Sequence, residues 1–295
     1  MYPLQVAAFH AFITSPDQLR LRVAFALNQI FVVSAVDGSL RLPSRMAPYL
    51  QVLVTGAFGN FRQLLSDITL NPAMARFLDT VGNNRAAPNE NYARELLQLF
   101  TIGVDELNTD GTTKLDVNGQ RVATYDQAII TALARVLTGW VFAPPRTAGI
   151  TNYVHPLVPG NPNAHDMQAK TLLYGVTLPA GRDAPSDLRD ALDNIFAHPN
   201  VGPFISSRLI QHLVTSNPSP AYVGRVAAVF RSTGGSLKAV VRAILLDPEA
   251  RLDPAPQTAA DPVYGHLRAP VLWICAWLRA FGSQVVTDYV ADRNS

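Results

Sequence analysis

The sequence predicts a mainly α-helical protein, built as a single multi-helix domain with a long irregular segment and one or two short β-hairpins. Apolar residues recur at helical spacing along most of the chain, as between Leu19 and Phe31 and between Ala128 and Leu137. Asn or Asp often precedes a proline where one amphipathic stretch meets the next, which is typical of helix N-termini. With 48% hydrophobic and 16% charged residues in 295, the chain has enough apolar material for a sizeable core.

Periodicity and capping residues predict the helices in order. We expect them over residues 3–13, 17–35, 44–56, 60–69, 72–78, 90–102, 125–138, 187–197, 201–214, 220–232, 236–246 and 263–281. Corners between consecutive helices are expected at Asn71–Pro72, His198–Pro199 and Asp247–Pro248. Residues 1–295 are taken as one domain, and residues 140–185 as an irregular insertion within it, because Pro, Gly and Asn interrupt the periodicity there. Strand is expected only near residues 104–124 and 165–180.

Composition excludes several classes of protein. The net charge is only +2 and the basic residues are scattered, so no nucleic-acid partner is expected. The longest apolar stretch, from Val23 to Val36, is interrupted by polar residues, which argues against membrane insertion. The first residues lack the features of a signal peptide, and Cys275, the single cysteine, lies in an apolar run and is expected to be buried. The motifs GxSxG, HExxH and GxGxxG are absent, and no organic cofactor is expected.

The first candidate site is the segment NENYARELLQLFTIG, residues 89–103, which holds two of the four glutamates in the chain. In a helix, Asn91 and Arg94 share one face, with Glu95 beside them. We therefore consider Glu90, Arg94 and Glu95 as catalytic residues and Asn91 as a substrate-binding residue. In the alternative interpretation, Glu90 only complements the helix dipole and Arg94 pairs with an aspartate on a neighbouring helix.

The second candidate is the HD loop, residues 161–170, with the sequence NPNAHDMQAK. Histidine is suited to acid–base catalysis near neutral pH, and a carboxylate neighbour can orient it, so His165 and Asp166 are candidate catalytic residues. Alternatively, Asp166 caps a turn and His165 is exposed.

Trp140 begins the irregular segment and is either a wall for an apolar substrate or an anchor in the core.

The third candidate is the loop from Asp105 to Asn118. It offers five side chains with the hard oxygen ligands that calcium prefers, namely Asp105, Asn108, Asp110, Asp116 and Asn118. A Ca²⁺ ion is therefore a possible cofactor. Two ordinary Asx turns would explain the same residues.

The order of the motifs resembles that of a bacterial family, the domain of unknown function 1800. The resemblance rests on NENYARELLQLFTIG, LNTDGT, TYDQ, ARVLTGW, the HD loop with Lys170, HPNVGPFISSRLIQHLV, LKAVVRAILLDPEAR and LRAPVL. It implies a largely helical, often exported protein, with the helix rich in asparagine and glutamate as its hallmark. Members of the family are generally longer at both ends. Similar chains read approximately GKLREP where this one has residues 265–270, GHLRAP, so a basic and an acidic position are lost.

Two functions of different classes follow from these residues. The first is a hydrolase of a small neutral substrate such as an ester, lactone or glycoside, with a base supplied by Glu90, Glu95 or His165 and polarisation supplied by Arg94 or a metal. Its site is expected where the helix containing NENYARE meets the HD loop. The second is a non-catalytic helical binding or scaffold module, in which the same polar residues form a network that fixes helix packing.

Overall fold

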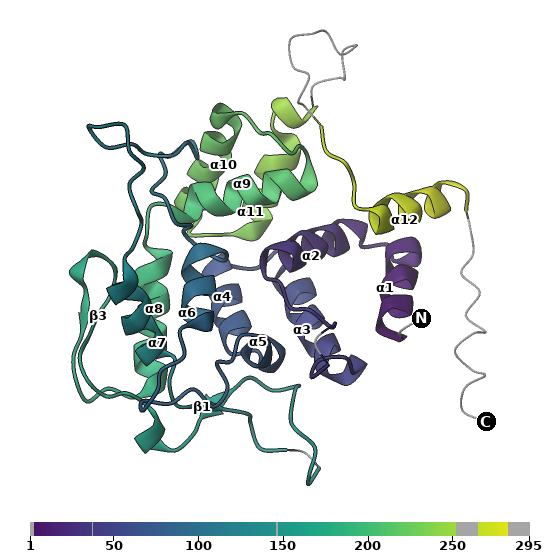
Figure 1. Ribbon diagram of the computed structural model, residues 1–295. Helices are drawn as coiled ribbons and strands as arrows, with labels where there is room; N and C mark the ends of the chain where they lie inside the picture. Colours follow the sequence, from purple (N-terminus) through teal and green to yellow (C-terminus); the bar gives the residue numbers. More distant parts are fainter. Residues whose placement is uncertain (1–2, 37, 146, 252–264, 283–295) are drawn as a thin grey trace.

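The computed structural model describes residues 3–36, 38–145, 147–251 and 265–282 (Figure 1). These residues form twelve α-helices and two small antiparallel sheets, which confirms a mainly α-helical fold. The helices are α1 (Pro3–Thr14), α2 (Gln18–Ile30), α3 (Pro43–Gly56), α4 (Phe61–Thr69), α5 (Pro72–Phe77), α6 (Asn91–Gln98), α7 (Gln127–Val136), α8 (Ala184–Phe196), α9 (Val201–Leu213), α10 (Pro220–Ser232), α11 (Leu237–Leu246) and α12 (Pro270–Ala280). None of the described helices is long and apolar enough to cross a membrane.

The helices pack in three groups that share a core. In Figure 1, α9, α10 and α11 lie together at the top, α4 to α8 lie at the lower left, and α1, α2, α3 and α12 lie at the right. Helix α2 packs on both α3 and α9, and α4 packs on α3 and α8, so the groups are joined. At the centre, the ring of Phe31 lies 6.1 Å from that of Phe61 and 5.3 Å from that of Phe100. The buried hydrophobic cluster runs without a break from α2 to α11.

Side-chain caps define where most helices begin. The side chains of Asn60, Asn71, Asp126, Asp183, Ser219 and Ser236 each accept a backbone N–H in the first turn of the helix that follows. Proline occupies the first turn of α5, α8 and α10, where it needs no hydrogen-bond partner. The corner at Asn71–Pro72 is therefore as predicted.

Several predicted helix bounds differ from the structure. Helix α2 ends at Ile30 instead of residue 35, because the backbone turns at Phe31, whose carbonyl oxygen accepts a hydrogen bond from the Tyr49 hydroxyl of α3. Helix α8 begins earlier than predicted because Asp183 caps it. Pro248 leads only into a single 3₁₀ turn, Glu249–Arg251. Helix α12 begins at Pro270, residues 265–269 are not helical, and residues 263–264 lie outside the described residues.

The strands lie mainly in the irregular insertion. Strands β3 (Lys170–Thr171) and β4 (Thr177–Leu178) form the predicted hairpin. The pairing of β1 (Trp140–Val141) with β2 (Val158–Pro159) was not predicted, because each strand is only two residues long and residues 142–157 separate them in the sequence. Residues 104–124 form only isolated bridges, such as Asp105 with Ala123 and Leu115 with Arg121.

Candidate functional site

A polar stripe on α7 connects the first two candidate segments. Gln127, Thr131 and Arg135 are four residues apart and therefore lie on one face of the helix. The first two contact Glu90, just before α6, whereas Arg135 contacts Asp166 in the HD loop. The structure thus brings both candidate segments to α7, although it does not place Glu90 beside His165.

Glu90 is held as a carboxylate by its neighbours. Its oxygens accept hydrogen bonds from Thr131 Oγ1 at 2.8 Å, Gln127 Nε2 at 2.9 Å and Arg94 Nη2 at 3.1 Å. The hydrogen bonds from Thr131 and Gln127 are the main reason that the pKa of Glu90 is lowered. Arg94 therefore pairs with Glu90 at the start of its own helix and not with an aspartate on a neighbouring helix. A carboxylate with a lowered pKa is a weaker general base.

The other two candidates on α6 are in different surroundings. The backbone N–H of Asn91 donates to the side chain of Asn89, and Asn91 itself is exposed. The half-buried carboxylate of Glu95 has no hydrogen-bond partner among the described residues. Burial raises the pKa of Tyr125 and the negative charge of Glu95 adds to this shift, so the two groups lie near each other. Glu95 is thus the glutamate of this segment whose side chain is not held by a neighbour in the described residues.

His165 is buried, with 3% of its surface exposed. Its Nδ1 lies 2.9 Å from the carbonyl oxygen of Thr138, and its Nε2 lies 3.2 Å from Oδ2 of Asp187. Gly139 makes this packing possible, because its φ is +86° and a Cβ there would lie 3.0 Å from the His165 backbone nitrogen. Both ring nitrogens of His165 therefore face protein atoms in the interior.

A cluster of charges around Asp187, on α8, was missed by the sequence analysis. The fully buried carboxylate accepts hydrogen bonds from Lys170 Nζ at 2.7 Å and Arg182 Nε at 2.8 Å, in addition to its contact with His165. Lys170 is only 1% exposed and also donates to the carbonyl oxygens of Asp166 and Gln168. We name Asp187, Lys170, Arg182 and His165 the Asp187 cluster. One sequence signal could have indicated it, since Lys170 is one of only three lysines and follows the HD dipeptide closely.

Asp166 forms a bidentate ion pair at the surface of the HD loop. Arg135 donates to its two oxygens, from Nε at 2.8 Å and from Nη2 at 3.1 Å. Burial acts to raise the pKa of Asp166, but Arg135, the backbone N–H of Gln168 and the charge of Lys170 outweigh burial, so the pKa is lowered. Asp166 does cap a turn, as the alternative interpretation proposed, although the adjacent His165 is not exposed.

An open depression of about 980 Å³ lies beside this ion pair. The segment before α6 forms one side of it, because the backbone N–H of Arg85 donates to the carbonyl oxygen of Ala164 in the HD loop. The lining residues are Arg85, Ala86, Arg135, Asp166, Met167, Gln168, Ala169 and Ala180. The exposed guanidinium of Arg85 has no acidic partner among the described residues. The depression therefore presents one free cation next to a neutralised ion pair.

Trp140 is an anchor in the core. It is 3% exposed and pairs with Pro159 across the β1–β2 sheet, and it does not line the depression. Its indole nitrogen is buried without a hydrogen-bond partner in the described part of the chain. Its carbonyl oxygen accepts the N–H of Gly82, so Trp140 also ties the segment before α6 to the insertion.

The loop from Asp105 to Asn118 consists of turns that are satisfied by their own hydrogen bonds. Asp110 accepts from the N–H and hydroxyl of Thr112, and Asp116 accepts from the N–H groups of Asn118 and Gln120; these bonds lower the pKa of both aspartates. Asp105 pairs with Arg121, and Asn108 bonds Thr112. Nowhere in the described ranges do three His, Cys, Asp or Glu side chains gather closely enough to hold a metal ion.

The chain belongs to the DUF1800 family. The family profile, described as a protein of unknown function, matches residues 1–293, which is nearly the whole chain. The curated proteins and the solved structures that were compared with the chain contained no match.

Proposed function

We propose that the protein is a non-catalytic helical binding module and that the depression beside the HD loop binds a small molecule with a carboxylate or similar anionic group. The observation that carries the proposal is the position of Arg85, whose unpaired guanidinium lines the depression next to Arg135. Arginine presents a planar fork of donors that matches a carboxylate, and this geometry favours such a ligand.

The surroundings of the acid–base candidates support a binding role over catalysis. Acid–base catalysis requires a group that reaches the substrate directly or through one water. His165 is 3% exposed and Glu90 is held by three side chains, while neither lines the depression. The Asp187 cluster is best explained as the network that fixes the HD loop and the irregular insertion on α7 and α8.

The proposal is tested by isothermal titration calorimetry with acetate, succinate and citrate. We expect at least one of these carboxylates to bind and the Arg85→Ala variant to bind it roughly 10- to 100-fold more weakly, since a charge-assisted hydrogen bond contributes about 1.5–3 kcal/mol. The Arg231→Ala variant is the matched control, because Arg231 is exposed on α10, away from the depression. Absence of binding, or equal loss in both variants, would refute the proposal.

One observation favours hydrolysis as a second candidate function. Asp166 and Arg135 place a carboxylate and a guanidinium side by side in the wall of the depression, and such a pair can orient a water and polarise an ester, lactone or glycoside. A screen of these substrates tests this candidate. Turnover that is lost in Asp166→Asn would favour the hydrolase. Turnover that instead depends on Glu90, Glu95 or His165, tested by Glu90→Gln, Glu95→Gln and His165→Ala, would support the site expected from the sequence.

A further inference from the structure

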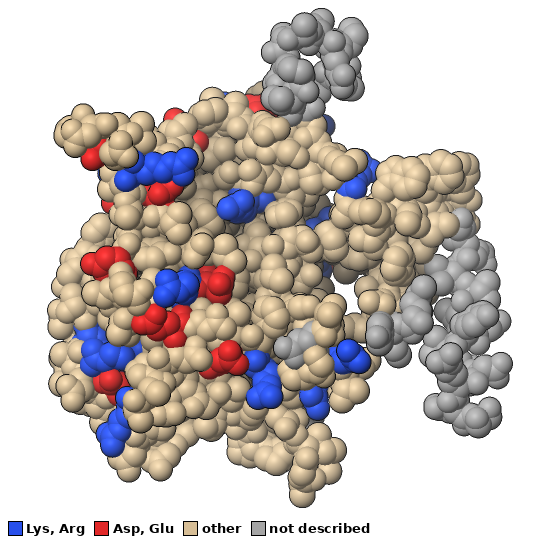
Figure 2. Space-filling view, in the orientation of Figure 1, with Lys and Arg blue, Asp and Glu red and all other residues tan. Residues whose placement is uncertain are grey.

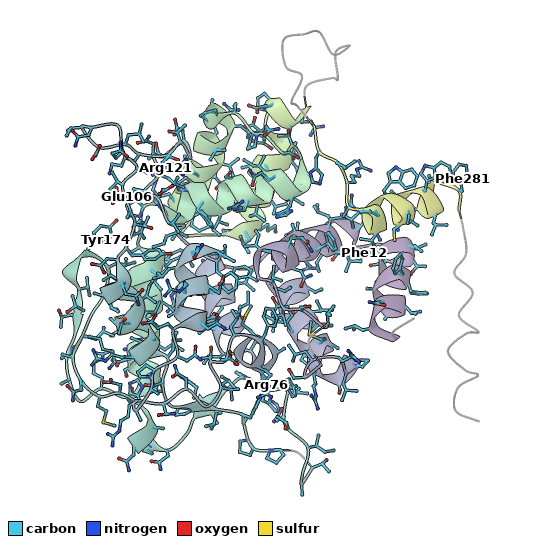
Figure 3. All side chains as sticks on the ribbon, in the orientation of Figure 1. Phe12, Arg76, Glu106, Arg121, Tyr174 and Phe281 are labelled. Atoms are coloured by element: carbon cyan, nitrogen blue, oxygen red, sulfur yellow. The ribbon has the colours of Figure 1, made fainter. Side chains whose placement is uncertain are left out.

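The outer face of α12 is a continuous row of exposed aromatic rings. Leu272 and Cys275 are buried on the side that packs against α1, whereas Trp273, Trp277 and Phe281 point away from it with exposed fractions of 53%, 56% and 73%. The rings of Trp273 and Trp277 stack at 5.6 Å, and those of Trp277 and Phe281 meet edge to face at 5.1 Å. Figure 3 shows Phe281 at the outer end of α12, and Phe12, which belongs to α1, at its inner side near α2.

The apolar surface extends beyond this row. Ile274, on the same helix, is 43% exposed, and Leu267, just before it, is 95% exposed. Helix α1, PLQVAAFHAFIT, consists mostly of apolar residues, and most of its side chains are only partly buried. Apolar patches of this kind on a folded protein mark sites of interaction.

In the described part of the chain, the charged residues on the two segments that form this surface are all basic, and the nearby Asp17 is paired with Arg20. Neither α1 nor residues 265–282 contain an Asp or Glu, whereas Arg268 and Arg279 lie on the second segment and Arg22 lies on α2. Arg22 and Arg279 line a cleft together with Phe12 and Cys275. Among the described residues, neither Arg22 nor Arg268 has an acidic partner. In Figure 2, the part of the surface formed by α1 and α12 shows isolated blue residues and no red ones.

Arg22 and Arg268 are close enough for the charge of one to shift the pKa of the other. Burial lowers the pKa of Arg22, and the positive charge of Arg268 lowers it further. Like charges without a counter-ion are costly, which indicates that the surface is suited to an anionic partner.

We propose that the α12 face, comprising Trp273, Trp277 and Phe281 with the adjacent Arg268, docks on an anionic lipid bilayer. Tryptophan rings favour the interface between headgroups and acyl chains, and arginines favour the lipid phosphates. An amphipathic helix can lie in this interface without crossing the bilayer, and α12 is a helix of 11 residues with one packed face and one aromatic face. Because neither α1 nor residues 265–282 carries an acidic residue, charge complementarity favours an anionic surface.

Vesicle binding provides the test. Two of the three tryptophans of the chain lie in the α12 face, whereas Trp140 is already buried. We expect vesicles of phosphatidylglycerol and phosphatidylcholine to shift the tryptophan emission to the blue and to retain the protein in flotation. Vesicles of pure phosphatidylcholine should bind far less, and added salt should weaken the binding.

Variants locate the binding surface. Each cation near a bilayer contributes roughly fivefold in affinity, so Arg268→Glu should weaken binding roughly 10- to 30-fold. Lys238→Glu is an equal charge change at an exposed side chain of α11 and should have little effect. The double variant Trp273→Ser with Trp277→Ser should remove flotation, while Val117→Ser, at a fully exposed valine elsewhere, should not. Unchanged melting midpoints show that these variants fold.

Two results would overturn the proposal. The first is that the parent protein fails to bind the anionic vesicles, or binds them equally well with Arg268→Glu and with the tryptophan variant. The second is a concentration-dependent dimer in light scattering that disappears with the tryptophan variant while vesicles bind nothing, because the α12 face would then be an interface between two copies of the chain.

Discussion

Replacing Asp187 by Asn removes the negative charge at the centre of the Asp187 cluster while keeping the size of the side chain. Lys170, which is 1% exposed, then loses the negative charge that pairs with it at 2.7 Å, and the nearest remaining carboxylate oxygen is that of Asp166 at 4.0 Å. Removing one partner of a buried ion pair costs about 3–5 kcal/mol. We expect the lower end of this range, about 3 kcal/mol, because two carbonyl oxygens still accept from Lys170 and Asp190 still pairs with Arg182.

Urea unfolding followed by circular dichroism measures this loss. A loss of 3 kcal/mol corresponds to a fall in the melting midpoint of roughly 6–10 °C for a chain of this size. Glu106→Gln is the matched control, because the Lys114–Glu106 pair has the same length of 2.7 Å but its lysine side chain is 53% exposed; we expect it to cost less than about 1 kcal/mol. Equal losses for Asp187→Asn and Glu106→Gln would refute the structural role of the cluster.

The lysine on the other side of the pair provides a second check. Lys170→Met removes the cation. It should lower the free energy of unfolding less than Asp187→Asn does, because Arg182 and His165 still contact the Asp187 carboxylate. In the double variant the two losses should not add, since the residues contact each other directly. Additive losses would mean that the ion pair itself contributes no coupling.

Three further predictions concern single features of the fold. The pKa of Asp166 is lowered in the folded state, so its ion pair stabilises the protein above the unfolded pKa of about 4 and this contribution is lost as the pH falls through the folded pKa. Asp166→Asn should therefore lower the free energy of unfolding at pH 7, and the difference from the parent protein should shrink as the pH falls below about 4. Gly139→Ala should lower the melting midpoint more than Gly119→Ala does. Both glycines have positive φ, but only Gly139 has neighbours that a Cβ would meet. Equal falls in the midpoint would contradict the packing of Gly139 against His165. Calcium binding at the loop from Asp105 to Asn118 stays a proposal from its sequence and competes with the hydrogen bonds that Asp110 and Asp116 accept within the loop. If the ion binds, millimolar Ca²⁺ should raise the melting midpoint relative to excess chelator, whereas identical midpoints would leave only the two turns.

Local sequence signals predicted most of the helices. Capping by Asn71 and Asp126 depends only on residues within one turn, so the sequence contains all the information needed. The end of α2 could not be predicted in this way, because the chain turns at Phe31, whose carbonyl oxygen is bonded by a tyrosine of another helix. Helical periodicity between residues 31 and 35 was therefore misleading.

The candidate site was predicted less well than the fold. The HD loop and the segment around Glu90 were singled out from the sequence as polar, yet their partners on α7 are more than 30 residues away in sequence. The burial of His165 depends on Asp187, which a sequence reading sees only as an acidic residue near a helix N-terminus. The free cation of Arg85 became visible only when the structure showed which arginines have carboxylate partners.

A crystal structure with the carboxylate that binds most tightly in calorimetry would test the proposed binding function most directly. We expect the ligand to lie intact in the depression, with its carboxylate within hydrogen-bond distance of the Arg85 guanidinium and close to the Arg135–Asp166 pair. The Asp187 cluster should be unchanged beneath it. A ligand bound elsewhere on the molecule, or an ester or lactone analogue found cleaved in the depression, would contradict the account of a non-catalytic binding module.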